Sequence, residues 1–236
     1  MPTRPRQIPG RSGRLKRPKH QGTYPCGAQS RQRLIETAIE VFGNLGFDGA
    51  CTRLLAQKAG VNLSAIPYYF GGKEGLYNAA AEHIAAGAAA KNAPAIARAE
   101  ATLQDPTLTR PDAIAVLQDM LVSVAALSLG ADGNDHWARF VTREQMDPTS
   151  AFDILYDGVL SRFHSLCAAL VARILDQAPD DEDTLIRTTA IIGQILVFRT
   201  ARATALRRLG WKTFTTQRID AILDVVHKQT RAILET

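Results

Sequence analysis

The sequence predicts an all-α protein of about nine helices, and three observations lead to that fold class. Apolar residues recur at helical spacing through most of the chain after residue 30, as along Phe152, Leu155, Val159 and Phe163. Glycine and proline cluster between these stretches, where helices end. No segment alternates apolar and polar residues as a half-buried strand would. We expect a three-helix DNA-binding domain over residues 30–75 and a larger helical domain over 76–236.

The basic residues are unevenly distributed. Seven of them lie in the first 30 residues, which contain no acidic residue, so the formal net charge of +5 leaves the rest of the chain slightly acidic. Residues 1–29 are rich in Pro, Gly and Arg and too poor in apolar residues to fold, which predicts a disordered basic tail. Such a tail can follow DNA phosphates or enter a minor groove. It can equally be a solvated tail without a specific role, or an extension from a misassigned start codon.

Composition argues against an enzyme, a metal site and a membrane protein. The three cysteines form no C-x-x-C pair and the five histidines are isolated from one another. No phosphate-binding, nucleophile-elbow or zinc-protease motif is present, so we expect no catalysis, no cofactor and no metal. No apolar run reaches the length of a membrane span, and the basic N-terminus lacks the apolar region of a secretory signal. We therefore expect a cytoplasmic protein.

The N-terminal elements follow from their boundary residues. A first helix over residues 30–45, with Ser30 as N-cap, carries a helically spaced apolar face. Thr52 is the natural N-cap of a short helix over 53–59, and Gly60 stands where a left-handed C-terminal residue is needed. Asn62 then caps a third helix, so only Gly60, Val61 and Asn62 separate two short helices. This spacing predicts a helix-turn-helix, although spacing alone equally permits a helical hairpin in a core.

The third helix would expose residues 63–69 toward a DNA major groove. It contains no Arg, Lys or Gln from Leu63 to Phe70, so the usual bidentate base contacts are scarce. Ser64 and Ala65 can touch base edges and methyl groups, and Tyr68 and Tyr69 can donate to phosphates. Proline in the middle of a helix lacks an amide and crowds the preceding turn, so we expect this helix to be kinked or tightened at Pro67.

The C-terminal region reads as a succession of helices. The segment from residue 73 is alanine-rich and continues past residue 90, and Pro111 suits the first turn of the next helix. Acidic residues at 180–183 suit the N-terminus of another helix. We expect helices over residues 73–90 with a continuation, 111–129, 135–145, 150–177, 183–209 and 215–234.

Residues 31–76 resemble the N-terminal domain of the TetR family of transcription regulators. The matching positions are Ala38, Val41, Phe42, Gly46 and Phe47, then Thr52, Ala56, Ala59, Gly60 and Val61, then Ile66, Tyr68, Phe70, Lys73, Glu74 and Leu76. Residues 137–211 resemble the ligand-side domain of the CecR-like branch, through Arg143 to Pro148, Ala190 to Ile195 and Leu209 to Trp211. That branch usually carries Asn where this chain has Pro67, which puts a transferred base contact there in doubt.

The resemblance implies a set of DNA-contacting positions. Family members commonly touch DNA through the residues that match Thr52, Ser64, Ala65, Tyr69 and Lys73. To these we add Arg33 and Arg53 as cations near the motif, together with Asn62, Pro67 and Tyr68 from the turn and the exposed face of the third helix. Each added cation can equally be a solvated charge.

The resemblance also implies a ligand cavity and a homodimer. Apolar walls with a few charged groups suit a ligand site, although any one of these residues can be ordinary core. The candidate ligand residues are Trp137, Phe140, Arg143, Glu144, Met146, Phe152, Phe198 and Arg199. Arg143 and Glu144 can instead form a structural ion pair. The last two helices offer apolar faces for a dimer, with candidates Ile192, Ile195, Arg202, Ile219, Ile222, Leu223 and Val226.

The sequence therefore predicts a dimeric regulator of transcription. Its partners would be a palindromic double-stranded DNA operator and a small-molecule effector that releases it, which makes it a repressor. One alternative is an architectural DNA-binding protein that uses the basic tail for affinity and has no ligand. Another is a helical enzyme or carrier, for which no convergent pair of titratable residues is found.

Overall fold

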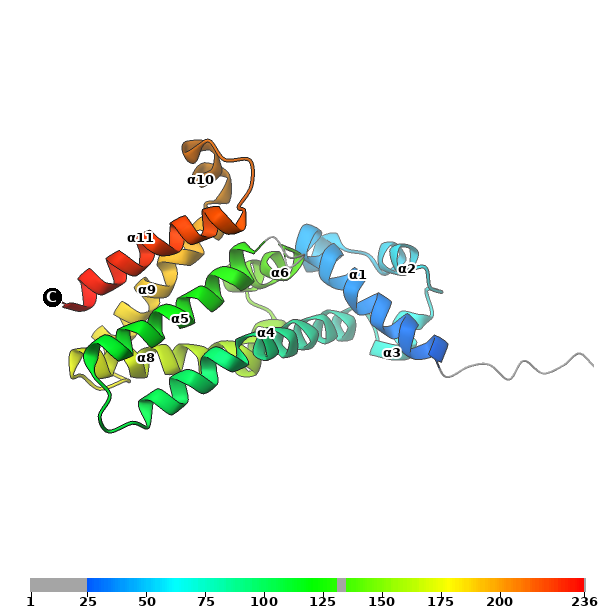
Figure 1. The fold of residues 1–236 in the computed structure, drawn as a ribbon. Coiled ribbons are helices and arrows are strands. Elements are labelled where there is room, and N and C mark those ends of the chain that lie inside the picture. The colour runs from blue at the N-terminus through cyan, green and yellow to red at the C-terminus, as the bar shows by residue number, and fades with distance from the viewer. Residues whose placement is uncertain (1–24, 131–134, 236) are drawn as a thin grey trace, which may run out of the picture.

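The computed structural model describes residues 25–130 and 135–235, and its regular elements in those ranges are all helices. Figure 1 shows three helices at one end of the molecule: α1 (Pro25–Gly49), α2 (Thr52–Ala59) and α3 (Ala65–Phe70). Residues 1–24 of the tail predicted over residues 1–29 lie outside the described residues, whereas residues 25–29 are helical and belong to α1, which corrects the prediction for them. The first helix begins at Pro25 rather than at Ser30, so Ser30 lies inside α1 instead of capping it.

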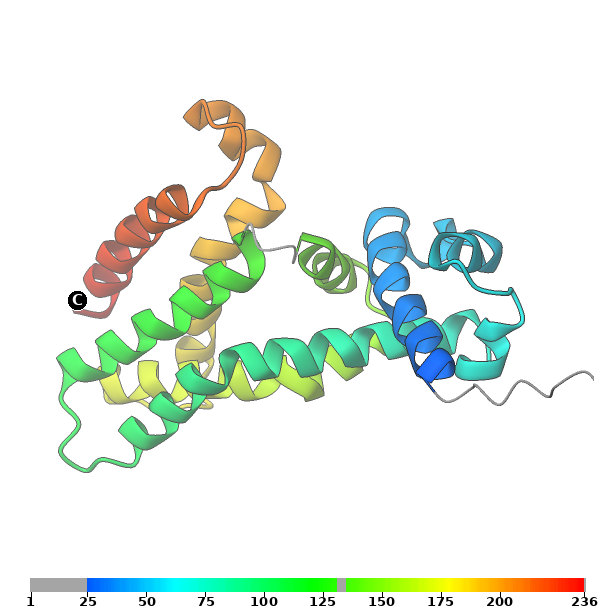
Figure 2. The ribbon, with the colours of Figure 1, turned by 45° about the vertical axis from the view of Figure 1, so that its right-hand side comes forward.

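The long helix α4 (Lys73–Leu103) runs from this end into the rest of the molecule (Figure 2). It includes Pro94 and extends well beyond the predicted end near residue 90. The other helices form the second, larger part of the structure, with α10 projecting from it (Figure 1). They are α5 (Arg110–Leu129), α6 (Asp135–Met146), α7 (Ser150–Leu155), the π-helical turn η1 (Tyr156–Leu160), α8 (Ser161–Leu175), α9 (Glu182–Thr200), α10 (Arg202–Leu209) and α11 (Thr216–Glu235).

Two predicted helices are each divided in the structure. The helix expected over residues 150–177 contains the π-helical turn η1, and the one expected over 183–209 breaks at Ala201 (φ −97°, ψ 28°). Elsewhere the boundary residues act as expected: Pro111 lies in the first turn of α5 after the Thr109 cap, and Asp181 caps α9 by accepting from the amides of Asp183 and Thr184. Gly210 ends α10 in the left-handed conformation.

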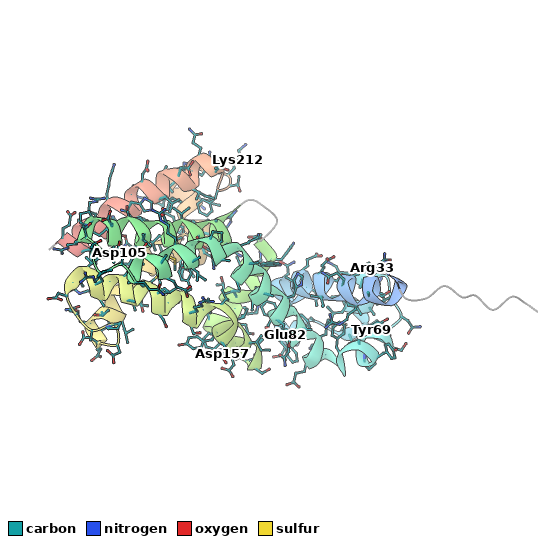
Figure 3. The ribbon with its side chains drawn as sticks, turned by 60° about the horizontal axis from the view of Figure 1, so that its bottom comes forward. Arg33, Tyr69, Glu82, Asp105, Asp157 and Lys212 are labelled. Atoms are coloured by element: carbon teal, nitrogen blue, oxygen red, sulfur yellow. The ribbon has the colours of Figure 1, made fainter. Side chains whose placement is uncertain are left out.

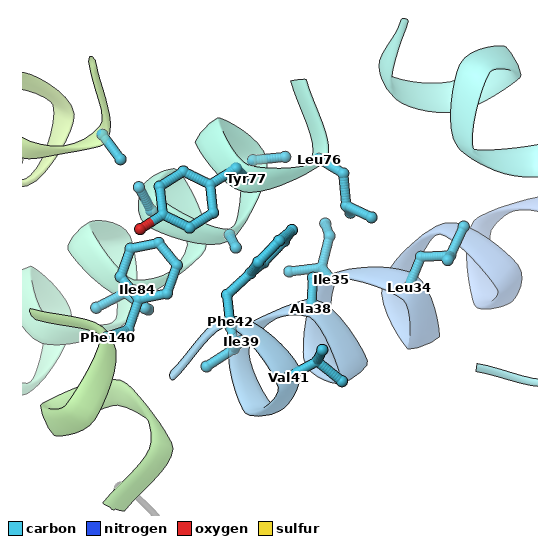
Figure 4. Packing of buried hydrophobic residues seen from close by; sticks show 14 of the residues in the cluster. Leu34, Ile35, Ala38, Ile39, Val41, Phe42, Leu76, Tyr77, Ile84 and Phe140 are labelled. Atoms are coloured by element: carbon cyan, nitrogen blue, oxygen red, sulfur yellow. The ribbon is translucent and has the colours of Figure 1, made fainter. Parts of the chain in front are cut away.

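One hydrophobic core, here called the DNA-side core, joins the three N-terminal helices to the first half of α4, α6, α7 and η1. Phe42 of α1 packs edge-on against Tyr77 of α4 with ring centroids 4.7 Å apart, and Tyr77 packs against Phe140 of α6 at the same distance. Figure 4 shows these three rings meeting among aliphatic side chains of α1 and α4. Because this core continues past residue 75, the three-helix domain does not pack by itself.

A second core, the C-terminal core, is formed by the end of α4 with α5, α8, α9 and α11. Its fully buried members are mostly aliphatic, such as Leu117, Leu121 and Leu170, with Phe214 from the segment before α11. Cys167 of α8 is also buried here, and burial raises the pKa of its thiol to about 12. This thiol is therefore protonated and unreactive at neutral pH.

Two stretches are long and apolar enough to cross a membrane by length and composition. They are Arg110–Leu129 and Ser150–Leu175. In the structure both contribute buried residues to the two cores and pack against each other and against α4. The core helices of soluble proteins pass the same test.

Candidate DNA-binding face and effector cavity

The end of α2 is set by Gly60, as the sequence predicts. Gly60 has φ 64° and ψ 39°, a left-handed conformation that glycine adopts without steric cost. The amide of Val61 donates to the carbonyl of Ala56 at 3.0 Å, which closes the helix end. At the other end, α2 begins at Thr52 itself. Cys51 occupies the N-cap position without a side-chain hydrogen bond, so the prediction that Thr52 caps α2 is wrong by one residue.

The turn between α2 and α3 is organised by Asn62. Its Oδ1 accepts hydrogen bonds from the amide of Ser64 at 2.9 Å and from the hydroxyl of Ser64 at 2.8 Å. This is the local side-chain bonding that stabilises turns. The helix α3 starts only at Ala65, so Asn62 shapes the turn rather than capping the helix directly. Both Asn62 and Ser64 remain exposed.

The predicted distortion at Pro67 does not occur. Pro67 is the third residue of α3, and the helix continues through it to Phe70. Amides in the first turn of a helix have no partner within the helix, so proline removes nothing there. The amide of Tyr68 still donates to the carbonyl of Ser64 at 3.1 Å. The sequence argument failed because it started the helix at residue 63 and so placed Pro67 too far inside.

The exposed face here is formed by Leu63 and Ser64 of the turn before α3 and by Pro67 and Tyr68 of α3. Tyr68 is 81% exposed and its ring meets that of Tyr69 edge-on at 4.8 Å, whereas Tyr69 is half-buried and Ala65 packs against the DNA-side core. Figure 3 places Tyr69 and Arg33 at the end of the molecule that lies away from Asp105. This end therefore presents aromatic and small polar groups.

Cations surround this face. Arg33 and Arg53 are exposed on α1 and α2, and the Nη2 of Arg33 donates to Ser30 Oγ at 3.3 Å. At the start of α4 the Lys73 ammonium lies 4.3 Å from the centre of the Phe47 ring. Sequence reasoning missed Arg31, whose guanidinium lies 5.2 Å from the centre of the Phe70 ring at the end of α3. Its place two residues before Arg33, on the same helix, was the available signal.

A cavity of about 370 Å³ lies where the DNA-side core meets the C-terminal core. Its volume falls within the range of small-molecule sites. Side chains from α4, α5, α6, α8 and α9, with the α7–η1 segment, form its walls, and these walls are mainly apolar. The lining includes Ile84, Ala88, Val124, Leu127, Trp137, Val141, Leu155, Leu160, Phe163 and Ile192.

The structure places only part of the predicted ligand set at this cavity. Trp137, Met146 and Arg199 line it, and Met146 is 80% exposed at its rim. The others lie elsewhere: Phe140 is in the DNA-side core, Arg143 faces Gly46 of α1, and Phe152 and Phe198 are outside the wall. A helical stripe cannot distinguish these positions, because residues on one helix face divide between core and cavity.

Glu144, another predicted ligand residue, is committed to a buried hydrogen-bond network. Its Oε1 accepts from the Tyr77 hydroxyl at 2.5 Å, and its Oε2 accepts from the amide and hydroxyl of Thr149 at 3.1 and 3.0 Å. Burial, then the hydrogen bond to Glu144, raises the pKa of Tyr77 well above its ordinary value. The alternative Arg143–Glu144 ion pair is absent from the described contacts. The Glu144 network instead ties α6 to α4.

Among the polar side chains of the cavity wall, Asn92 and His164 were not predicted from the sequence, whereas Arg199 was. Asn92 of α4 is only 4% exposed and its Oδ1 has no hydrogen-bond partner among the described residues. His164 of α8 has its pKa lowered by burial, which favours the neutral ring. Arg199, in the ligand set, is only 8% exposed at its side chain. No sequence pattern marks Asn92 and His164 as cavity residues, because the packing of the helices decides that their side chains line the cavity.

Arg199 is held by Asp135, the first residue of α6. Its Nη1 donates to Asp135 Oδ1 at 2.5 Å and its Nη2 to the Asp135 carbonyl at 3.2 Å. Burial raises the pKa of Asp135, but the hydrogen bond and charge of Arg199, with the charge of Arg139, outweigh it and leave that pKa below its usual value. Arg139 also donates to Asn44 Oδ1 of α1 at 2.8 Å. A chain of polar contacts thus leads from the cavity wall to α1.

The predicted dimer residues lie mostly inside the protomer. Ile192, Ile195, Ile222, Leu223 and Val226 are buried in the C-terminal core, Ile219 packs against it, and Arg202 stacks over the Phe214 ring. Their burial corrects the expectation that this apolar face stays uncovered. A neighbouring stripe of α9 and α11 is exposed instead. It consists of Ile186, Ala190, Val197, Ala221 and Val225.

Comparison with known proteins identifies the family. Residues 34–80 match the bacterial regulatory proteins of the tetR family. Residues 113–236 match the C-terminal domain of the HTH-type transcriptional dual regulator CecR. The CecR protein of Shigella flexneri is 34% identical over 202 residues, covering 85% of this chain and 89% of that protein. This chain belongs to the TetR family, in its CecR branch.

Solved structures agree with the fold. A candidate transcriptional regulator from Pseudomonas aeruginosa PAO1 superposes with a TM-score of 0.59 at 17% identity, covering 90% of this chain and 93% of that one. A TetR-like transcriptional regulator from Rhodococcus sp. RHA1 gives a TM-score of 0.51 at 19% identity, covering 87% and 96%. This TetR-family protein is therefore a DNA-binding transcriptional regulator with an N-terminal helix-turn-helix.

Proposed function

We propose that this TetR-family protein is a cytoplasmic repressor that binds a palindromic operator as a dimer and is released by a small molecule. The observation that carries the proposal is the position of α6. This helix contributes Trp137, Ala138 and Val141 to the cavity wall, and its other side contacts α1 of the DNA-binding region through Arg139 and Asn44. A molecule in the cavity is therefore separated by one helix, α6, from α1 of the DNA-binding region.

Release requires that the ligand prefer one conformation. A ligand shifts an equilibrium only by its difference in affinity for the two states, so it must bind the arrangement that fits DNA less well. Movement of α6 and α4 is the available route, because both helices touch the cavity and the DNA-side core. Ligand binding would then change the separation of the two α3 helices in a dimer.

The exposed stripe on α9 and α11 supports the dimer. Its side chains are apolar or small: Ile186, Ala190 and Val197 on α9, with Ala221 and Val225 on α11. Small residues allow helices to approach closely, and exposed apolar faces of this kind mark interfaces. Replacing Val197 with Glu would place a charge on this stripe, and we expect a monomer by sedimentation. Leu209→Glu, at an exposed position on α10, is the matched control.

DNA selection tests the function directly. Purified protein would be used to select bound duplexes from a random pool at physiological salt, with and without residues 1–24, the part of the basic tail that precedes α1. A recovered palindrome with two half-sites about one helical turn apart supports the repressor. If only unselective, salt-sensitive binding is recovered, the result favours the architectural DNA-binding protein. The observation that supports this alternative is the lack of Arg, Lys and Gln side chains on α3, which are the usual groups that read bases.

A further inference from the structure

Arg199 is the only charged side chain among the described residues that line the cavity. The Arg199 side chain is only 8% exposed, and its charge requires compensation because an isolated charge in a low-dielectric surrounding is costly. Asp135 supplies that compensation, although the Asp135 side chain is itself 40% exposed. The cavity wall thus has one fixed positive group, and its partner Asp135 is not among the described lining residues.

The guanidinium has donors to spare. It carries five N–H groups, and the described hydrogen bonds engage only Nη1 and Nη2. The remaining N–H groups can bind an oxyanion, for which the planar fork of arginine is well suited. A cationic molecule would find no carboxylate among the described lining residues. The neutral ring of His164 adds no competing charge.

The rest of the cavity fits an apolar body. Trp137 and Phe163 provide aromatic surface, and Ile84, Val124 and Leu160 provide aliphatic surface. On the α4 wall, the unpartnered Oδ1 of Asn92 can accept a hydrogen bond from a hydroxyl or amide on such a body. We propose that the effector is an organic anion with an apolar body, and that its anionic group competes with Asp135 for Arg199. This inference rests on the ligand-controlled function proposed above.

Competition for Arg199 would act on α6 at its first residue. Asp135 holds α6 to α9 through Arg199 and accepts from Arg139, which in turn donates to Asn44 on α1. The fit between α6 and α1 is close, since a Cβ added at Gly43 would lie 2.9 Å from the His136 carbonyl oxygen. An anion that binds Arg199 in place of Asp135 removes the contact that holds the first residue of α6. The packing of α6 against α1 then changes.

The test compares ligands that differ in charge but not in shape. Two sets are used: naphthalene carboxylate, carboxamide and methylammonium, and octanoate, octanamide and octylammonium. Binding is measured by calorimetry and by the rise in Tm with ligand concentration. We expect the carboxylate in at least one set to bind about tenfold more tightly than its amide, and the ammonium to bind weakest. Equal binding of carboxylate and amide in both sets overturns the proposal.

Variants test whether the preference for the carboxylate over its amide depends on Arg199. Arg199→Gln should remove the carboxylate preference, whereas Arg187→Gln, which breaks the exposed 2.6 Å pair with Asp183 on the same helix, should leave it intact. Asp135→Asn removes the competing carboxylate and should strengthen carboxylate binding about tenfold. A gain in affinity cannot come from misfolding, so the prediction survives even if Arg199→Gln is unstable. Unchanged or weaker carboxylate binding by Asp135→Asn contradicts the competition.

DNA binding separates this inference from the proposed function. Once an operator has been selected with ligand-free protein, the tighter-binding carboxylate should lower operator affinity in the parent and Arg187→Gln proteins but not in Arg199→Gln. If no operator is recovered, the proposed repressor function fails whatever the ligands do. If an operator is recovered and the carboxylates neither bind preferentially nor release it, only the present inference fails.

Discussion

The DNA-side core and the C-terminal core differ in what they join. The DNA-side core brings together α1, α2, α3, α4 and α6 through mutually packed aromatic rings and the buried Glu144–Tyr77 hydrogen bond. The C-terminal core is mainly aliphatic and joins helices that carry the exposed α9 and α11 stripe. The cavity takes its walls from both. A molecule bound in the cavity would therefore contact side chains of both cores.

The largest expected effect is loss of the central ring in the DNA-side core. Phe42→Ala removes a fully buried side chain between α1 and α4 and should lower the free energy of unfolding by about 3–5 kcal/mol. Leu170→Ala makes the equivalent cavity in the C-terminal core, with an expected loss of about 2–5 kcal/mol. Urea unfolding followed by circular dichroism measures both.

The contrast between the cores predicts a difference in their residual function. At temperatures where both variants are folded, Phe42→Ala should weaken operator binding, while Leu170→Ala should chiefly weaken the dimer. Leu170→Ala could instead impair DNA binding as much as Phe42→Ala at protein concentrations that keep it dimeric. The assignment of operator binding to the DNA-side core and of dimerisation to the C-terminal core would then be wrong.

The next effect concerns the buried carboxylate. Tyr77→Phe keeps the ring packing but removes the hydroxyl that donates to Glu144, which is 1% exposed. Leaving a buried acceptor without this donor should cost about 1–3 kcal/mol in unfolding free energy. Tyr156→Phe, at a side chain that is about half exposed on η1, is the matched control and should change little. Equal losses in the two variants would show that the Tyr77–Glu144 hydrogen bond contributes no more to stability than the hydroxyl of the exposed Tyr156.

Gly43→Ala tests whether α6 transmits changes to α1. The added methyl would meet the His136 carbonyl at 2.9 Å, so the two helices must separate slightly. We expect about 1 kcal/mol lower stability and a reduced operator affinity without any ligand. Leu45→Ala, on the same helix at an exposed site, provides the control for stability and fluorescence-anisotropy measurements. An unaltered operator affinity would argue against α6 as the connecting element.

A smaller effect is the pH dependence contributed by His164 in the cavity wall. Burial lowers its pKa from 6.5, so the unfolded chain binds more protons than the native protein as the pH falls below that value. This contribution to stability is present above pH 6.5 and is lost as the pH decreases further. His164→Gln should flatten the fall in Tm between neutral and mildly acidic pH. His83→Gln, outside the cavity wall, should retain the parent slope.

The smallest effect is expected at Pro67. Because this residue lies in the first turn of α3, Pro67→Ala should change the free energy of unfolding by no more than about 0.5 kcal/mol. A stabilisation well above that value, measured by urea unfolding, would indicate strain at this position. A change in the operator preference of Pro67→Ala would then indicate that Pro67 contacts DNA at the surface of α3, and not that it distorts the helix.

Local sequence rules succeeded where a few neighbouring residues decide the outcome. Gly60 and Pro111 each act within one turn of their own position, so the end of α2 and the start of α5 could be predicted, whereas Asn62 organises the turn instead of capping α3 as predicted. The same rules misplaced Pro67 because an error of two residues at the start of α3 decides whether the amide at this position needs a partner within the helix. They also missed the break at Ala201, where no Gly or Pro marks the end of α9.

The sequence by itself determined the all-α class, the order of the main helices and the DNA-binding motif, since these depend on periodicity and on turn residues close together in the chain. The tertiary structure alone decided which apolar residues face the cavity, that Glu144 bonds to Tyr77, and that Arg199 bonds to Asp135. The partners in these pairs lie 67 and 64 residues apart in the chain. Their meeting depends on how the helices pack, which no local pattern records.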